Sequence, residues 1–180
     1  MPIRPFEGRA PRIHPTAFVD DTAAVIGDVE IGADSSIWPL CVVRGDVHHI
    51  RIGARTSIQD GSIIHATHDS RFCPGGQPTR VGNEVTVGHK AILHACTVED
   101  FCLIGMGAIV MDQAVVQAWV TLGAGSLVPP GKVLESGYLY VGSPARRIRP
   151  LSEREREFLA YSPQNYQRLK ERHRATTVLS

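Results

Sequence analysis

The sequence predicts an all-β solenoid, a parallel β-helix built on a six-residue repeat and followed by a C-terminal α-helix. Three observations lead to this fold class. Aliphatic residues recur at a spacing of six, small and turn-forming residues occupy fixed places between them, and a helical pattern begins only after residue 150. Such a chain stacks coil upon coil, and each coil buries its inward side chains against the next.

The aliphatic series defines the repeat and the expected core. Apolar residues recur near every 3.6 positions on a helix and every two positions on a half-buried strand, so a spacing of six fits neither. It fits a short strand and a tight turn, three times per coil, around a triangular prism. The inward positions, which we call anchors, are Ile13, Val19, Val25, Ile31, Ile37, Val43, Ile52, Ile58, Ile64, Val81, Val87, Leu93, Val98, Ile104, Val110, Val116, Leu122 and Val128.

Turn formers and small residues fill the rest of the repeat. Asp100 and Asp112 stand two positions after an anchor, where we expect the chain to turn. Slim residues stand four positions after many anchors, as narrow corners require: Ala17, Ala23, Ser35, Cys41, Ala91, Ala108, Ala114 and Ser126. Pro129-Pro130-Gly131 is expected to end the regular series.

The repeat is interrupted in three places. Residues 46–51 insert three positions, residues 66–80 form a loop rich in Gly, Pro and polar residues, and one position is missing between Leu93 and Val98. Solenoids tolerate such departures where the stacked core survives, and they often carry the binding face. We therefore expect the functional site in the middle third of the prism. Cys96, two positions after His94, is expected to point outward.

The chain is expected to divide into an N-terminal segment (1–12), the β-helix (13–150) and a C-terminal helical segment (151–174). Ser152 and Glu155 match a capping box, which predicts a helix that begins near Glu153. Pro163 is expected to stop or kink this helix, with a second helical stretch over 164–173. A helix here can cover an exposed side or end of the solenoid.

Composition argues against several classes of partner. A net charge of +1 and a pI near 7.8 favour neither a nucleic acid nor a membrane surface. No apolar stretch approaches the roughly 20 residues that cross a bilayer. The N-terminus lacks the apolar core of a signal peptide, so we expect a cytoplasmic protein. The four cysteines form no Cys-x-x-Cys pair and are expected to be reduced thiols.

Assigning the anchors to faces aligns two histidines. We call the face of Val43 face A; the chain then continues to face B and face C. One position past three face A anchors lie Arg44, His65 and His94, in one outward column with a spacing of about 4.8 Å. Two imidazoles at that separation can converge on one metal ion.

A third histidine falls on a different face. His89 lies on face C, above Asp60 and diagonal to Gln59. Within one chain a face edge of about 17 Å separates it from His65 and His94. We therefore predict a homotrimer that lays face A of one chain against face C of the next. Each of its three metal sites takes His65 and His94 from one chain and His89 from its neighbour.

Four stretches then identify a family by resemblance: RGDV (44–47), IQDGSIIHATH (58–68), VTVGHKAILHACTV (85–98) and GSLVPPGKVLESGYLYVGSPARRIRPLS (125–152). They resemble the γ-class carbonic anhydrase-like family, especially its short bacterial branch, over about residues 10 to 170. Because its members are hexapeptide-repeat proteins, the resemblance implies a left-handed β-helix. It also implies that His65, His89 and His94 bind Zn²⁺, with Fe²⁺ or Co²⁺ as alternatives.

The resemblance implies an activity and further site residues. The activity is the reversible hydration of carbon dioxide to bicarbonate by a metal-bound hydroxide. Gln59 would stand beside the metal-bound water, and Arg44 and Asp60 would form an ion pair between subunits with Asp46 nearby. Tyr161 would fold back over the site.

One departure from the family keeps other functions open. The archaeal prototype has a glutamate directly after its Arg-x-Asp motif and a proton-shuttling glutamate in an acidic loop. Here Val47 takes the first place, and Asp69 is the only acid of residues 66–80. The alternatives are a catalytically weak or inactive metal-binding trimer that serves as a scaffold or accessory protein, and a hexapeptide-repeat acyltransferase that uses acyl-CoA.

Overall fold

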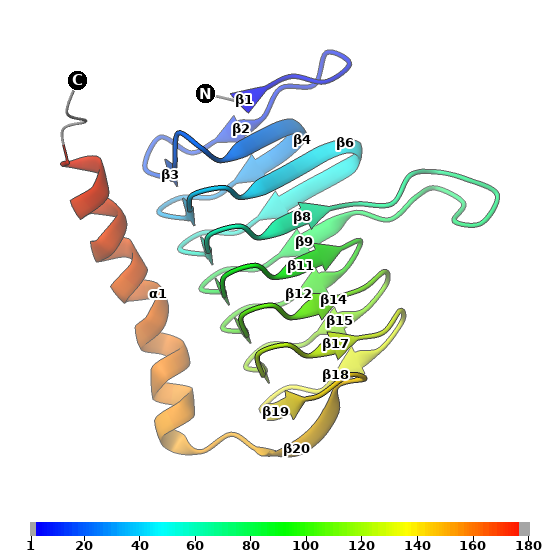
Figure 1. Cartoon of the computed structure of the whole chain (residues 1–180), viewed down its shortest axis with the longest axis vertical. Coiled ribbons are helices and arrows are strands. Elements are labelled where there is room, and N and C mark those ends of the chain that lie inside the picture. The colour runs from blue at the N-terminus through cyan, green and yellow to red at the C-terminus, as the bar shows by residue number, and fades with distance from the viewer. Residues whose placement is uncertain (1–2, 177–180) are drawn as a thin grey trace.

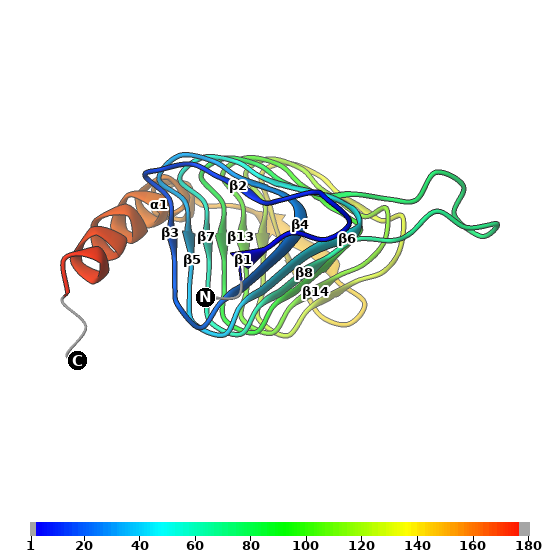
Figure 2. The same ribbon diagram turned by 90° about the horizontal axis from the view of Figure 1, so that it is seen from above.

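The computed structural model describes residues 3–176; residues 1–2 of the expected N-terminal segment lie outside the described part. The chain winds as a parallel β-helix of about eight turns, and one long helix runs along its side (Figure 1). Viewed from above, the coils superpose as a triangular prism (Figure 2). The predicted fold class is confirmed.

Two faces of the prism share one 12-stranded sheet, because two long strands run through both. These are β4 (Ala24–Ile31) and β6 (Val42–Ile52). Face A otherwise carries β1 (Ile3–Arg4), β8 (Ile63–His65), β11 (Ile92–His94), β14 (Ile109–Val110) and β17 (Leu127–Val128). Face B carries β2 (Arg12–Ile13), β9 (Thr79–Val81), β12 (Thr97–Val98), β15 (Val115–Val116) and β18 (Val133–Leu134).

Face C is an eight-stranded sheet. Its strands are β3 (Phe18–Val19), β5 (Ser36–Ile37), β7 (Ser57–Ile58), β10 (Thr86–Val87), β13 (Leu103–Ile104), β16 (Thr121–Leu122), β19 (Tyr138–Val141) and β20 (Arg146–Pro150). Only its last pair, β19 and β20, is antiparallel. Neighbouring coils pair anchor to anchor, as Ile58 does with Val87 and Ile64 with Leu93.

The core is the stack of anchors that the six-residue spacing predicts. All anchors from Val25 to Val128 are buried, and the first two are partly buried at the open end of the prism. We expected the series to end at Pro129-Pro130-Gly131, but this prediction is wrong. The series continues through Leu134 and Tyr140, which are buried and extend faces B and C. The prolines are tolerated because they lie at a corner, outside the strands that form the ladder.

The shortened turn after Leu93 changes the orientation that we expected for Cys96. Its side chain is buried in the core rather than exposed. Because Cys96 stands two positions before the face B anchor Val98, strand alternation turns both inward. The prediction of an outward thiol counted from His94 and ignored the missing residue. All four cysteines are free thiols.

The C-terminal segment is a single helix, α1 (Glu153–Arg174), which begins with the predicted capping box of Ser152 and Glu155. Pro163 does not stop it, because the helix packs on face C and buries Ser162 and Pro163 there. The Ser162 hydroxyl lies 2.9 Å from that of Thr86 on β10. This docking holds the helix together across the proline. No helix of residues 3–176 is long and apolar enough to cross a membrane.

Residues 66–80 form a hairpin that projects from the prism at the corner between faces A and B (Figure 1). Its root is paired through the backbone of Thr67 and Gln77, which exchange two hydrogen bonds of 2.9 Å. Asp69 accepts the amide of Gly75 at 2.7 Å and so closes the outer part. The hairpin therefore begins one residue after β8, which ends at His65.

Candidate metal centre

The structure places the predicted site residues on two different faces of the prism. Arg44, Asp46, His65 and His94 lie together on face A, where His94 pairs with His65 in the strand ladder. Gln59, Asp60 and His89 follow anchors of face C, and Tyr161 is on the helix that packs there. The division into faces that the repeat predicts is confirmed by the strand register.

The two histidines of face A converge. His65 Nδ1 and His94 Nε2 lie 3.2 Å apart. Two nitrogens bound tetrahedrally to one zinc ion at 2.0–2.1 Å would be about 3.3 Å apart, so this spacing fits a shared ion. His94 is followed at the corner by Ala95, whose left-handed φ of 49° turns the chain towards face B. The ladder and this turn fix both imidazoles at the edge of face A.

Each of the three histidines has its own carboxylate neighbour. His65 Nε2 lies 3.1 Å from Asp46 Oδ1, and His94 Nδ1 lies 2.7 Å from Asp112 Oδ1. On face C, His89 Nδ1 lies 2.9 Å from Asp60 Oδ2. Metal-binding histidines commonly hold their second ring nitrogen in such a contact, which fixes the tautomer and the ring orientation. The donor set therefore suits a metal ion.

Electrostatics favour the protonation states that metal binding needs. Burial lowers the pKa of His65 and so favours its neutral ring. Burial alone would raise the pKa of Asp46, but hydrogen bonds from Arg44 and His65 outweigh it and lower that pKa. At Asp112 burial is outweighed in the same way by hydrogen bonds from Thr67 and His94, and its pKa is lowered. Both carboxylates are therefore ionised at neutral pH.

A single chain does not complete the predicted triad. Among residues 3–176, no group of three His, Cys, Asp or Glu side chains is arranged to hold a metal ion. His65 and His94 side chains are 17% and 37% exposed, whereas His89 on face C is 49% exposed. Three neutral imidazoles at one ion would require His89 from another copy.

The remaining predicted residues have partners within the chain. Arg44 forms an ion pair with Asp46, so its pairing with Asp60 of a neighbouring subunit stays a prediction. Gln59 is buried beneath α1, where its hydrogen bond partly offsets the burial that raises the pKa of Tyr166. Tyr161 is half exposed, and the guanidinium carbon of Arg168 lies 5.6 Å from its ring centroid.

Asp112 is the site residue that the sequence analysis missed. It entered only as a turn former, two positions after Val110. A usable signal was present, because Val110 is the face A anchor one coil beyond Leu93. Asp112 follows that anchor by two positions, at the corner beside His94, and its carboxylate can reach the imidazole from there.

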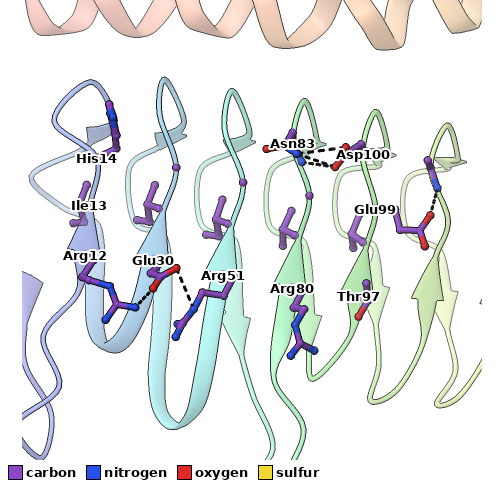
Figure 3. Close-up of a pocket in the computed structure, with 18 residues that line it drawn as sticks. Arg12, Ile13, His14, Glu30, Arg51, Arg80, Asn83, Thr97, Glu99 and Asp100 are labelled. Atoms are coloured by element: carbon purple, nitrogen blue, oxygen red, sulfur yellow. Dashed lines mark hydrogen bonds and ion pairs between the residues drawn. The ribbon is translucent and has the colours of Figure 1, made fainter.

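A groove of about 940 Å³ lies elsewhere, on face B. Figure 3 shows Arg12 and Arg51 on the two coils that flank the coil of Glu30, and both arginines are paired with this glutamate. Arg51 also lies 2.7 Å from Asp28. The groove contains none of the three histidines. Because Arg12 and Arg51 are already neutralised, the paired imidazoles are the better candidate site.

Comparisons with known proteins find relatives that match nearly the whole chain. The chain is 52% identical over 171 residues to Protein YrdA of Escherichia coli, covering 95% of this chain and 93% of that protein. It is 44% identical to the mitochondrial gamma carbonic anhydrase 1 of Arabidopsis thaliana, covering 93% of this chain and 60% of that protein. A scan against models of known protein families finds no match.

Solved structures give the same fold. A hexapeptide transferase family protein from Anaplasma phagocytophilum superposes with a TM-score of 0.87 at 41% identity, covering 94% of this chain and 96% of that one. Fold and repeat thus define a hexapeptide-repeat β-helix protein. The chain belongs to the γ-carbonic anhydrase-like family of these proteins.

Proposed function

We propose that this protein is a homotrimer with a divalent metal ion at each subunit interface, and that it reversibly hydrates carbon dioxide to bicarbonate. The observation that carries the proposal is the 3.2 Å approach of His65 Nδ1 to His94 Nε2, with His89 on another face of the same chain. Two ligands without a third make an incomplete site. A second copy supplies the missing imidazole without any change of fold.

The outer surface of face A supports the assembly. The residue before each face A anchor points outward, and in this column all are aliphatic: Ala24, Val42, Ile63, Ile92, Ile109 and Leu127. The same column on face B begins with charged residues, and face C is partly covered by α1. An aliphatic stripe beside His65 and His94 is a surface that another subunit would bury.

The corner that carries His89 is suited to meet this stripe. Met106 lies one coil after His89 and Leu40 lies two coils before it, and these side chains are 57% and 68% exposed. Docking this corner against face A would remove both side chains from water and bring His89 towards His65 and His94. Burial of apolar surface contributes about 25 cal/mol per Å², so the contact stabilises the trimer as it completes the site.

The chemistry follows from the donor set. A divalent ion held by three imidazoles acts as a Lewis acid that lowers the pKa of water towards about 7. Asp46 and Asp60 orient His65 and His89, and Arg44 holds Asp46. Gln59 lies on the same face as His89, but its side chain is buried and hydrogen-bonded to Tyr166, so its contact with the metal-bound water stays a prediction. The aliphatic stripe offers an apolar wall to carbon dioxide.

The test combines metal content, assembly and rate on one preparation. The protein is expected to hold about one metal ion per chain, to sediment as a trimer, and to hydrate carbon dioxide in a stopped-flow indicator assay. His89→Ala is expected to lose metal and rate together. A metal-loaded trimer with no rate above buffer would reject the hydration activity, and a monomer would reject the shared site.

A metal-binding trimer without appreciable hydration is a second candidate, and the projecting hairpin favours it. Asp69, its only acid, accepts the Gly75 amide at 2.7 Å and is engaged in closing the hairpin. Val47 offers no proton acceptor either. With no acid free to shuttle protons and only His68 of the hairpin left for that role, proton release is expected to limit turnover, so addition of imidazole buffer is expected to raise the rate. No rate at any buffer concentration would select the scaffold function.

An acyltransferase is a third candidate, because the superposed Anaplasma phagocytophilum protein is described as a hexapeptide transferase family member. Such an enzyme needs one histidine as general base and a groove for acyl-CoA. Calorimetric titration with acetyl-CoA separates the two functions. We expect no binding, since Arg12 and Arg51 in the face B groove are paired with acids and leave Arg80 as the one lining arginine of the described residues without an acidic partner.

A further inference from the structure

We propose that Asp112 is a positioning residue for the metal ligand His94, and that Thr67, at the root of the projecting hairpin, holds Asp112 in place. The inference rests on the metal site proposed above and adds two residues to it. Neither carries a role in the resemblance to the family. The proposal stands on a chain of contacts that runs from the hairpin to the imidazole.

The first contact fixes the tautomer of His94. Asp112 Oδ1 lies 2.7 Å from His94 Nδ1. An ionised carboxylate only accepts hydrogen bonds, so the hydrogen between them belongs to Nδ1. The lone pair of the neutral ring is then on Nε2, which is the atom that faces His65 Nδ1 at 3.2 Å. Asp112 thus turns the metal-binding nitrogen of His94 towards the site.

The second contact fixes Asp112. The hydroxyl of Thr67 donates to Asp112 Oδ2, so each carboxylate oxygen has its own donor. The backbone of Thr67 is itself held by two hydrogen bonds to Gln77 across the hairpin root. A side chain on a paired backbone offers a fixed donor, and the carboxylate cannot rotate without losing one partner.

The other strand of the hairpin root contacts the second ligand. The hydroxyl of Thr79 donates to the carbonyl oxygen of His65. Both strands that leave and rejoin the prism therefore touch the ligand-bearing residues, Thr67 through Asp112 and Thr79 directly. The hairpin root therefore restrains the positions of the two imidazoles through these hydrogen bonds.

The chain contains a matched control for Asp112. Asp100 also stands two positions after an anchor, but one face away from the histidines, and it accepts the Asn83 amide at 2.7 Å. Removing either aspartate costs a partly buried contact with the preceding coil. Only the removal of Asp112 frees a metal ligand.

The experiment measures metal affinity by competition of zinc with a chromophoric chelator, for the full-length protein and its variants. Asp112→Ala is expected to bind zinc about 10- to 100-fold more weakly than the wild type, as loss of an orienting partner typically does. Thr67→Val is expected to weaken binding in the same direction, and Thr67→Ser, which keeps the hydroxyl, is expected to restore it. Asp100→Ala, which removes the carboxylate at the equivalent place on face B, should bind as the wild type does.

A second readout separates positioning from general loss of structure. The visible spectrum of the cobalt-loaded protein reports ligand geometry, and it is expected to change in Asp112→Ala and Thr67→Val but not in Asp100→Ala. If Asp112→Ala does not fold, the comparison of Thr67→Val with Thr67→Ser tests the inference. Unchanged zinc affinity in Thr67→Val, or in a folded Asp112→Ala, overturns the inference while the metal site stands. A wild type that binds no zinc overturns the metal site and the inference with it.

Discussion

His89 lies 2.9 Å from Asp60, and this pair belongs to a different face from His65 and His94. All three histidines nevertheless share one local arrangement, a carboxylate oxygen beside one ring nitrogen. An isolated surface histidine has no need of such a partner. The repetition of the contact on two faces supports the proposal that His89 binds the same ion as the other two histidines.

A shared site predicts that two inactive variants complement each other. His65→Ala lacks a ligand on face A, and His89→Ala lacks the ligand on face C. Refolded together in equal amounts, they are expected to form about three quarters mixed trimers, each with one complete site. Zinc content should therefore rise to about a quarter of an ion per chain, measured by atomic spectroscopy after gel filtration.

Each variant refolded alone supplies the control for this complementation, and both are expected to hold little zinc. A site contained within one chain would give no gain on mixing. A mixture no richer in metal than its components would thus contradict the shared site, provided that mixed trimers are detected by a mass tag on one chain.

The aliphatic stripe on face A predicts where a charge disrupts the assembly. Ile92→Lys places an ammonium group in the proposed interface, where burial of an unpaired charge costs several kcal/mol, and is expected to shift the trimer towards monomers at micromolar concentration. Thr97→Lys is the matched control, because Thr97 holds the same outward place before an anchor on face B. Equal sedimentation of the two variants would exclude face A as the interface.

The period of six predicts the positions that matter most for the fold. Counting anchors assigns His65 and His94 to one column, and the strand register confirms it. Counting anchors at a spacing of six gives a wrong prediction where a corner changes length, as at Cys96, or contains proline, as at Pro129. Corners lie outside the ladder, so their composition tells little about whether the coil continues.

The contacts of individual polar side chains are harder to predict. Asp112 was expected only to form a turn, because spacing gives the place of a residue but not the direction of its carboxylate. The same limit applies to Pro163, whose cost to the helix is offset by packing on face C that local sequence does not reveal. Contacts between subunits depend on a second chain and stay predictions.

The capping box of α1 predicts a pH-dependent contribution to stability. Hydrogen bonds from Arg149, and then from Ser152, lower the pKa of Glu155 to about 2. Because this folded pKa is depressed from 4.5, the stabilisation is present above pH 4.5 and is lost as the pH falls towards 2. Glu155→Gln should therefore be less stable than the wild type at neutral pH, by about 0.5–1 kcal/mol for an exposed cap.

Thermal unfolding followed by circular dichroism at 222 nm checks this pH dependence. The difference in stability between Glu155→Gln and the wild type is expected to shrink as the pH falls below about 4, because the stabilisation from the depressed pKa of Glu155 is then progressively lost. Glu153→Gln, in the same first turn, is the control and should show a smaller difference at neutral pH. A difference that does not vary with pH would assign the effect to packing instead.

The thiols give a test of the core that is independent of the site. Burial raises the pKa of Cys41 to about 11 and those of Cys96 and Cys102 to about 12, so none forms a thiolate at neutral pH. Cys73, in the projecting hairpin, is partly exposed. The native protein is expected to react with a chromogenic disulfide reagent at one thiol per chain, and at four after denaturation. Cys73→Ser should abolish the native reaction, whereas a rapidly reacting thiol in that variant would show that the coils open at Cys41, Cys96 or Cys102.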